Sequence, residues 1–292
     1  MKESSGEKFW SMFSNIAILI LCFIMIYPFV YVFFYSISDP VAVGAHPVTF
    51  YPVGFTMDNY KAVFQNNTIL LSLLVTVSRT LVGSFLHLVV TGLVAYALSK
   101  EKLLWKNFFI AFFVIPMYFG GGLLPYYVLI TKLHLTNNFL VYVLPTAFGV
   151  FNMLIMKVYF QQLPVSLEES ARIDGAGDFL IFARIIVPSS MPIIATVLMF
   201  IGVLQWNSWF DAFLFVNKHE LMPLQTILYK IILENEAKTI EDIMKLSRRG
   251  TKVTPEAIKM SSLIVATAPI VAIYPFLQKY FVKGMLLGAV KA

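Results

Sequence analysis

The residues most able to make specific contacts with another molecule gather in one short segment, residues 167–192, which reads LEESARIDGAGDFLIFARIIVPSSMP. The segment holds two glutamates, two aspartates, two arginines and two glycines, in a chain of which only 13% of the residues are charged. Carboxylates and guanidinium groups form charge-assisted pairs between proteins, and glycines permit tight turns. This composition is typical of a docking segment.

The local sequence indicates how these groups are positioned. Ser166 and Glu169 fit the S-x-x-E capping box that begins a helix. Gly175 and Gly177 offer stops for that helix, and Asp178 is a candidate N-cap for the next one. The sequence thus predicts a helix of about ten residues, which is marginal in water by itself and needs a surface to lie on.

Small and charged side chains share this predicted helix and its turn. The small residues allow close approach of another backbone: Ser170, Ala171, Gly175 and Ala176. The charged residues remain for pairing with a partner: Glu168, Glu169, Arg172 and Asp174. In the alternative interpretation Glu169 only caps its own helix and the rest is a solvated loop, but caps do not explain the small residues and both glycines together.

The rest of the chain is strongly apolar. Of its 292 residues 59% are hydrophobic, and the mean hydropathy is +0.78, which is a membrane composition. A membrane-spanning helix needs about 20 mostly apolar residues. The sequence predicts an all-α integral membrane protein with a short N terminus, residues 1–11, and one transmembrane domain, residues 12–292. Six segments qualify as spans: 12–37, 68–98, 104–130, 138–160, 189–216 and 260–282.

Basic residues in the short loops give the orientation. Lysines and arginines concentrate in the N terminus, 99–106, 157–188 and the C-terminal tail, whereas the opposite short loops hold only Lys61 and Lys132. The positive-inside bias therefore predicts that both termini and the loop 163–188 are cytoplasmic, and that the loop 217–258 is external. The same bias explains the net charge of +6 without a nucleic-acid partner.

A second polar cluster interrupts the fifth predicted span. Its members are Gln205, Trp206, Asn207, Ser208, Trp209 and Asp211. Polar groups at membrane depth are costly and normally face a protein interior or a water-filled path. Gln205 and Trp209 are predicted to share one helical face, and Asn207 and Asp211 another. Aromatic faces beside amide and carboxylate groups suit a sugar, although Trp anchoring at the interface and packing against a partner explain them equally well.

Two further features lie within predicted spans. Three consecutive glycines centred on Gly121, followed by Pro125, predict a break in the third span. We favour a kink beside a water-filled path over simple close packing of helices. Arg79 lies well within the second span, where it must snorkel to the outer edge, form an ion pair or face water.

Catalytic and metal-binding patterns do not stand out. The four histidines, His46, His87, His134 and His219, show no metal-ligand spacing. No H-E-x-x-H or G-x-S-x-G motif is present, and nothing resembles the phosphate-binding G-x-x-x-x-G-K-[ST]. The sequence predicts no catalysis, no metal and no cofactor in this chain.

Several motifs together resemble a known family. Glu169-Ser170-Ala171, Asp174-Gly175-Ala176, Ile185 and Pro188 resemble the E-A-A-x-x-D-G-A and I-x-x-P pattern of permease subunits of binding-protein-dependent ABC importers, with Ser170 where the family usually has alanine. Further motifs resemble the carbohydrate-uptake branch associated with oligosaccharides and polysaccharide fragments: FGGGLLP at 119–125, QWNSW at 205–209, PLQ at 223–225 and YPFLQKY at 274–280.

This resemblance implies a bacterial cytoplasmic-membrane protein with the fold of type I importer permeases. Its partners would be a second permease subunit, two ATPase subunits that bind ATP and Mg²⁺, an extracytoplasmic solute-binding protein, membrane lipid and a carbohydrate. The loop helix would couple the chain to the ATPase, with Glu169 pairing there. The resemblance also implies ATPase contacts by a C-terminal tail, including Gly284, Gly288 and Lys291, and binding-protein contacts by Met222, Pro223, Leu224 and Gln225.

Two other classes of function compete with this interpretation. An ion-coupled secondary transporter acting without an ATPase would usually show inverted repeats and paired broken helices with buried acids, which are not evident here. An intramembrane enzyme needs a catalytic constellation, which is not evident either. The sequence therefore favours an importer subunit whose cargo path includes Gln205, Trp206, Asn207, Trp209, Asp211 and Gly121.

Overall fold

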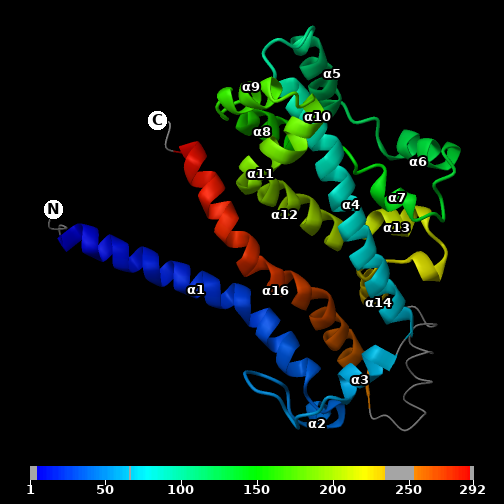
Figure 1. The fold of residues 1–292 in the computed structure, drawn as a ribbon. Coiled ribbons are helices and arrows are strands. Elements are labelled where there is room, and N and C mark those ends of the chain that lie inside the picture. The colour runs from blue at the N-terminus through cyan, green and yellow to red at the C-terminus, as the bar shows by residue number, and fades with distance from the viewer. Residues whose placement is uncertain (1–4, 66, 234–252, 290–292) are drawn as a thin grey trace. The chain divides into compact units, whose positions relative to one another are not determined.

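The computed structural model describes residues 5–65, 67–233 and 253–289, and within them the chain is helical (Figure 1). The only β pairing among these residues is an isolated antiparallel bridge between Ser38 and Phe55. The chain divides into two compact units, residues 1–69 with 228–268 and residues 70–227 with 269–292. Within the described ranges, three helices are long and apolar enough to cross a membrane, or up to five if each of two bent pairs is one span. The protein is thus an all-helical membrane protein with several apolar spans.

The helices of the described residues follow one another along the chain in a fixed order. They are α1 (Ser5–Ser36), α2 (Pro40–Ala45), α3 (Asp58–Gln65), α4 (Asn67–Ser99), α5 (Lys106–Tyr118), α6 (Leu123–Lys132), α7 (Leu140–Val143), α8 (Val150–Phe160), α9 (Ser166–Ile173), α10 (Asp178–Ile181), the π-helix η1 (Phe182–Ile186), α11 (Val187–Ser189), α12 (Met191–Asn207), α13 (Phe210–Phe215), the 3₁₀ turn η2 (His219–Leu221), α14 (Leu224–Leu233) and α16 (Pro255–Ala289).

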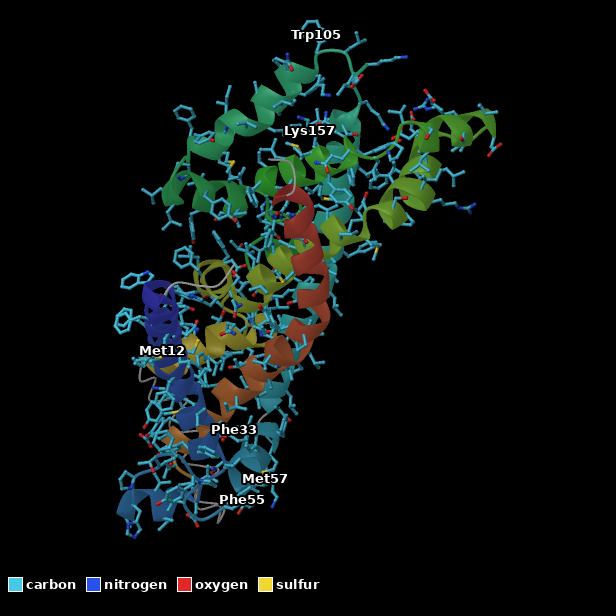
Figure 2. All side chains as sticks on the ribbon, turned by 90° about the vertical axis from the view of Figure 1, so that its left-hand side faces the viewer. Met12, Phe33, Phe55, Met57, Trp105 and Lys157 are labelled. Atoms are coloured by element: carbon cyan, nitrogen blue, oxygen red, sulfur yellow. The ribbon has the colours of Figure 1, made fainter. Side chains whose placement is uncertain are left out.

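In the first unit, α1 exposes apolar side chains on all sides. Met12 is 57% exposed and Phe33 46%, and Figure 2 shows such side chains standing out along the helix. The most apolar stretch of α1 has none of its residues buried. A helix that is apolar all round and not covered by its own chain is typical of a membrane span.

The segment 38–67, which follows α1, is fastened to the end of that helix. Asn59 on α3 is fully buried, and its Nδ2 donates to the carbonyl oxygens of Ser36 and Ser38, both at 2.9 Å. Ser261 of α16 also donates to the Ser36 carbonyl, at 3.3 Å. The two bonds to Ser36 satisfy the last carbonyl of α1, which no helical turn can reach.

In the second unit, the core lies where α4, α8, α9, α10, η1 and α12 meet. Its buried residues are Ala95, Tyr96, Leu98, Met153, Met156, Phe160, Ala171, Ile181, Phe182, Ile186 and Val197. Short side chains on α4 permit close packing here. At Gly92 an added Cβ would lie 3.3 Å from both Met156 and Phe182.

Three of the six predicted spans are interrupted. The predicted span 104–130 is broken between α5 and α6, which are bent by 115° at residues 119–122. The span 138–160 consists of α7 and α8 with a non-helical stretch between them, and 189–216 consists of α12 and α13 with a break at Ser208. A further bend of 87° separates α12 from the segment Asp178–Ser189.

The break at the three glycines agrees with the sequence-based prediction. Gly122 has φ +82°, a conformation that L-residues rarely adopt, and it precedes the first residue of α6. An added Cβ at Gly120 or Gly122 would meet no heavy atom within 4 Å of the described chain, and one at Gly121 would meet only Pro125. The glycines therefore permit the backbone bend, and no described helix packs closely against them.

Residues 217–258 are not a continuous polar loop, and that prediction missed α14. The segment LQTILYKIIL at 224–233 is apolar enough to pack, and Leu224 and Leu228 are buried. The charged residues that suggested a loop lie mostly at 234–252, outside the described residues.

Candidate functional site

The docking helix predicted from the sequence is α9, and it begins differently from the prediction. The N-cap residue is Val165, without a side-chain cap, so Ser166 is already the first helical residue. The backbone N–H groups of Leu167 and Glu169 donate to the carbonyls of Pro164 and Val165, at 3.2 and 3.1 Å. The capping box was therefore wrong, because the turn at Pro164 starts the helix before the hydroxyl of Ser166 can cap it.

The end of α9 agrees with the prediction of a glycine stop. Gly175 has φ +80°, its N–H donates to the carbonyl of Arg172 at 3.0 Å, and the N–H of Ala176 donates to the carbonyl of Ala171 at 2.9 Å. This pair of bonds is the Schellman motif, which closes a helix around a left-handed residue. The helix is therefore a short, firmly closed element of eight residues.

The side chains of α9 divide between an inner and an outer face. Ala171 is buried in the core of the second unit, and Ala176 is half-buried. The outer face and the turn expose the remaining predicted docking residues: Glu169, Ser170, Arg172, Asp174 and Gly175. Apolar side chains join them, with Ile173 86% and Phe179 71% exposed.

Glu168 differs from its neighbour Glu169. Its carboxylate forms an ion pair with Lys100, just past the end of α4, and both side chains are largely covered. The Lys100 ammonium also lies 3.7 Å from the centre of the Tyr96 ring. Glu168 therefore fastens α9 to the second unit, while Glu169 remains exposed. No local sequence pattern signals this pair, because Lys100 and Glu168 are 68 residues apart.

Asp178 does not cap α10 as predicted. Gly177 is the N-cap, and Asp178 forms an ion pair with Arg172 across the turn. Both side chains are more than half exposed, so this pair contributes little to stability. The ion pair compensates the charge of Arg172. Glu169 and Asp174 are the exposed carboxylates of α9 and its turn.

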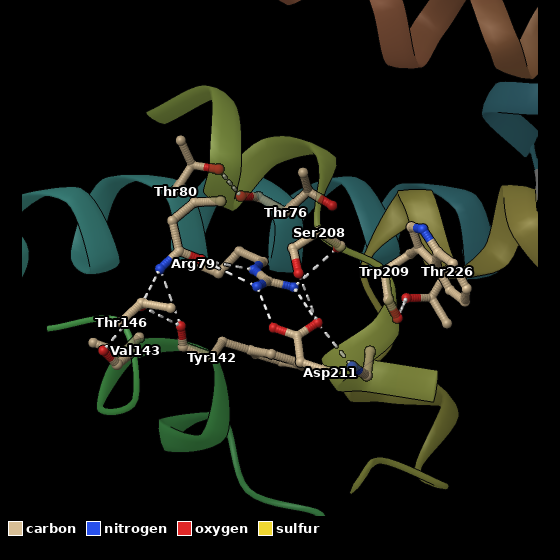
Figure 3. A network of polar contacts seen from close by, with 12 residues as sticks. Thr76, Arg79, Thr80, Tyr142, Val143, Thr146, Ser208, Trp209, Asp211 and Thr226 are labelled. Atoms are coloured by element: carbon tan, nitrogen blue, oxygen red, sulfur yellow. Dashed lines mark hydrogen bonds and ion pairs between the residues drawn. The ribbon is translucent and has the colours of Figure 1, made fainter. Parts of the chain in front are cut away.

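The second polar cluster joins Arg79 in a buried network (Figure 3). Arg79 on α4 is fully buried. Its Nη2 lies 2.5 Å from Asp211 Oδ2, and its Nη1 donates to the Ser208 carbonyl at 3.2 Å. We call this set the Arg79 network; its members are Arg79, Tyr142, Thr146, Gln205, Ser208 and Asp211. Of the alternatives for Arg79, the structural ion pair is confirmed and snorkelling is wrong.

Gln205 extends the network to α7 and the residues that follow it. Its Oε1 accepts from Arg79 Nε at 3.2 Å and Nη2 at 3.1 Å. Its Nε2 donates to the Tyr142 carbonyl at 3.0 Å and to Thr146 Oγ1 at 2.6 Å. The Arg79 guanidinium also stacks 4.4 Å from the centre of the Tyr142 ring. The charge of Arg79 is thus compensated by a carboxylate, a carbonyl, an amide and an aromatic face.

The break at Ser208 separates residues that the sequence placed on shared faces. Because α12 ends at Asn207, neither Gln205 and Trp209 nor Asn207 and Asp211 are one helical turn apart, and that prediction was wrong. Gln205 and Trp206 are buried, whereas Asn207 is exposed and donates to the Val203 carbonyl of its own helix at 3.0 Å.

The segment predicted to contact a binding protein is largely internal. Met222 is 3% and Leu224 1% exposed, and Pro223 is also buried. The Leu224 N–H donates to Thr76 Oγ1 at 2.8 Å. Only Gln225 reaches outward, with its Nε2 3.4 Å from Asn207 Oδ1. Contact by the first three side chains does not fit this conformation.

At the C-terminal end, Gly284 and Gly288 lie within α16, which continues to Ala289. A separate, non-helical tail is therefore not present up to that residue. Lys291 lies outside the described residues. No group of three or more His, Cys, Asp or Glu side chains is placed to hold a metal ion within the part of the chain that the structure describes.

Comparisons with known proteins match most of the chain. The family model described as "Binding-protein-dependent transport system inner membrane component" matches residues 88–287. The polygalacturonan/rhamnogalacturonan transport system permease protein YtcP of Bacillus subtilis (strain 168) is 35% identical over 274 residues, covering 94% of this chain and 95% of that protein. The arabinooligosaccharides transport system permease protein AraQ of Halalkalibacterium halodurans is 24% identical over 294 residues and covers 95% of each chain.

A solved structure matches the fold. It is a chain of a bacterial ABC transporter involved in the import of the acidic polysaccharide alginate. The TM-score is 0.90 with 26% sequence identity, and the match covers 96% of this chain and 99% of that chain.

Proposed function

The chain belongs to the family of binding-protein-dependent transport system inner membrane components, and from this premise we propose that it imports an oligosaccharide or a polysaccharide fragment by alternating access. It is an integral, multi-pass inner-membrane protein and the permease subunit of an ABC importer. Permeases of this family have no catalytic domain and carry no cofactor. The family resemblance predicted from the sequence is confirmed.

The proposed topology has six spans in the type I importer arrangement, with both termini in the cytoplasm. The broken segments α5–α6, α7–α8 and α12–α13 each count as one span in this proposal. The high TM-score to the alginate importer chain supports it, as does the concentration of lysine and arginine on one side of the predicted spans.

The proposed complex contains this chain, a second permease subunit, two ATPase subunits and an extracytoplasmic solute-binding protein. ATP and Mg²⁺ bind to the ATPase subunits, and lipid surrounds the spans. Relatives named for polygalacturonan, rhamnogalacturonan and arabinooligosaccharides support a carbohydrate as the cargo.

The observation that carries the coupling role is the exposed carboxylate of Glu169 on a closed, eight-residue helix. The Schellman turn at one end and the Lys100–Glu168 ion pair on the side fasten α9 to the second unit. A rigid element transmits a rigid-body movement, because packed structures switch as units and do not deform gradually. An ATPase cleft with a basic group and an apolar lining would pair with Glu169 and cover Ile173 and Phe179.

The same proposal keeps the fifth-span residues beside the cargo path. Asn207 and Trp209 are accessible and suit this role. The other members are buried or paired and would stabilise the wall of the path without contacting the cargo: Gln205, Trp206 and Asp211. Gly121 would contribute through the bend between α5 and α6, and Gln225 is the accessible member of the proposed binding-protein contact.

Charge reversal at Glu169 tests this function. In the complete complex in lipid nanodiscs, Glu169→Lys should lower saccharide-stimulated ATP hydrolysis at least tenfold, because a repulsive contact replaces one charged pair. Glu101→Lys is the matched control, since Glu101 is also exposed and lies on the same predicted face. Full ATP hydrolysis and uptake by Glu169→Lys would contradict the coupling role, and uptake by the chain without any ATPase would contradict the importer class.

A further inference from the structure

A cavity of about 710 Å³ opens in the second unit between α4, α5, α8 and α12. Its volume lies within the range of about 300–1,000 Å³ that is typical of small-molecule sites. Most of its lining is apolar, and its polar members are His87, Thr146 and Asn152. The sequence analysis assigned none of these three residues to a site.

The hydrogen bonds of His87 determine how Asn152 is oriented. The ring is nearly buried, with Nδ1 2.6 Å from the Thr146 carbonyl oxygen and Nε2 2.8 Å from Asn152 Nδ2. Because a carbonyl oxygen only accepts, Nδ1 carries the proton, and Nε2 accepts from the Asn152 amide. The amide nitrogen of Asn152 is therefore committed to His87. Its oxygen accepts no hydrogen bond from any described residue, which leaves an acceptor at the cavity wall.

This acceptor rests on a rigid support. Thr146 Oγ1 accepts from Gln205 Nε2, which links the His87–Asn152 pair to the Arg79 network. Gly149 allows His87 to approach, since an added Cβ at that glycine would lie 2.7 Å from His87 Cε1. A preorganised polar group binds a ligand at a lower entropic cost than a mobile one.

Aromatic rings supply the other half of the site. Phe151 is 55% and Phe200 36% exposed, and their ring centres are 6.4 Å apart at an angle of 40°. Both line the cavity that Asn152 lines. A pyranose or furanose ring has apolar C–H faces and hydroxyl edges, so rings on one side and a hydrogen-bond acceptor on another match its chemistry. An acyl chain would use the rings but not the acceptor.

The charge of the lining restricts the class of sugar. Among the described residues that form the cavity, none is Lys, Arg, Asp or Glu. The nearby guanidinium of Arg79 is already paired with Asp211. Burying a carboxylate without a compensating cation is costly. A uronate unit therefore fits this lining poorly, whereas an uncharged unit fits it well.

We propose that this cavity is a subsite for one uncharged sugar unit of the cargo. The Asn152 Oδ1 accepts from a hydroxyl, Phe151 and Phe200 cover a C–H face, and His87 is a positioning residue that acts through Asn152. This proposal rests on the proposed carbohydrate import and goes further, because it gives this chain a direct contact with the cargo and names the chemical class of the unit in contact.

A tryptophan in the cavity tests the proposal directly. In the complete complex in nanodiscs, without ATP, Phe151→Trp should show saturable changes in tryptophan emission with arabinotriose and maltotriose, but not with trigalacturonate. The unsubstituted complex supplies the background. Phe112→Trp is the matched control, because Phe112 is an exposed ring on α5 outside the cavity. In the Phe151→Trp complex, the further substitution Asn152→Leu should lower the apparent affinity for the neutral trisaccharides about tenfold. This is the effect of one lost hydrogen bond.

The control for Asn152→Leu is Asn107→Leu, an exposed amide on α5, which should leave binding unchanged. Equal responses to trigalacturonate and the neutral trisaccharides would overturn the restriction to uncharged units. Quenching of the tryptophan by dibrominated phosphatidylcholine without protection by arabinotriose would assign the cavity to lipid and overturn the subsite.

Substitutions of His87 test its positioning role. His87→Leu should weaken trisaccharide binding as much as Asn152→Leu, and His87→Gln should restore it, since the Gln oxygen can accept from the Asn152 amide. Equal loss in both variants would contradict positioning. If no saccharide alters the emission while the wild-type complex still shows saccharide-stimulated ATP hydrolysis, only the subsite fails. If that stimulation is absent with all three saccharides, the proposed import function fails with it.

Discussion

The Arg79 network and the loop around α9 use the same kinds of side chain in opposite ways. In the network, Arg79 is fully buried and hydrogen-bonded to Gln205, Ser208 and Asp211. In the loop, Glu169 and Asp174 are exposed on an element of eight residues. Charge in the network is compensated within the chain, and charge in the loop stays exposed, where the proposed ATPase contact would use it.

The comparison shows what distinguishes a structural polar group from a docking group in such an apolar protein. A buried charge must find its partner within the fold, because lipid and protein interiors offer no water to replace it. An exposed charge on a fastened helix has no such requirement. The ion pair Arg172–Asp178 lies between these extremes, since it is formed but more than half exposed.

Removing the carboxylate of the network should have the largest effect on stability. Asp211→Leu leaves the buried guanidinium of Arg79 without its counter-charge, and breaking a buried pair in this way costs about 3–5 kcal/mol. We expect the free energy of unfolding of the complex to fall by that amount, measured as a lower midpoint of thermal unfolding in nanodiscs.

The exposed pair supplies the control for this substitution. Asp178→Leu breaks the ion pair with Arg172 and should change the free energy of unfolding by about 0–1 kcal/mol. Combining Asp211→Leu with Arg79→Met should recover much of the lost stability, because no unpaired charge then remains. Equal thermal midpoints for Asp211→Leu and Asp178→Leu would contradict the claim that the buried ion pair contributes more to stability than the exposed one.

Sequence reasoning succeeded for the features that are local. The glycine stop at Gly175 and the break before Gly122 depend on backbone conformations that few residues other than glycine adopt, so the residue type announces them. The apolar length of α1 and α4 was likewise readable from composition. The capping box failed because two competing starts lie within three residues, and the turn at Pro164 comes first.

Long-range pairs could not be read from one sequence. Arg79 and Asp211 are 132 residues apart, and Lys100 and Glu168 are 68 apart, so no local pattern joins them. A charged side chain at membrane depth is costly, so the sequence predicted only that Arg79 has some partner. The fifth-span residues were placed on helical faces that the break at Ser208 abolishes. The cavity beside Asn152 could not be predicted from the sequence, because its polar members come from α4, α8 and the segment before α8.

A smaller effect is expected where the network meets α4. At Gly83 an added Cβ would lie 2.5 Å from Gln205 Nε2, so Gly83→Ala must displace the amide that joins Arg79 to Thr146. Overpacking of this kind costs about 1–3 kcal/mol. The control is Gly202→Ala, where the nearest atom is Ser84 Oγ at 3.9 Å. Both changes gain the same helix propensity, so the difference between their thermal midpoints isolates the clash. Equal midpoints would show that Gln205 moves freely and does not hold the network together.

The smallest effect belongs to the exposed loop. Gly175→Ala places a side chain at φ +80° with no heavy atom within 4 Å, so the whole cost is the left-handed backbone, about 1–2 kcal/mol. That cost acts on α9 alone, because the Schellman bonds to Ala171 and Arg172 close this helix and no other. Gly177→Ala is the matched control, since Gly177 has φ −75° and equally open surroundings. Amide hydrogen exchange of the peptide 166–178 should accelerate about five- to thirtyfold in Gly175→Ala and stay unchanged in Gly177→Ala. Equal exchange in the two variants would mean that the turn does not hold α9 closed, and the rigidity on which its docking role depends would have to come from the Lys100–Glu168 pair instead.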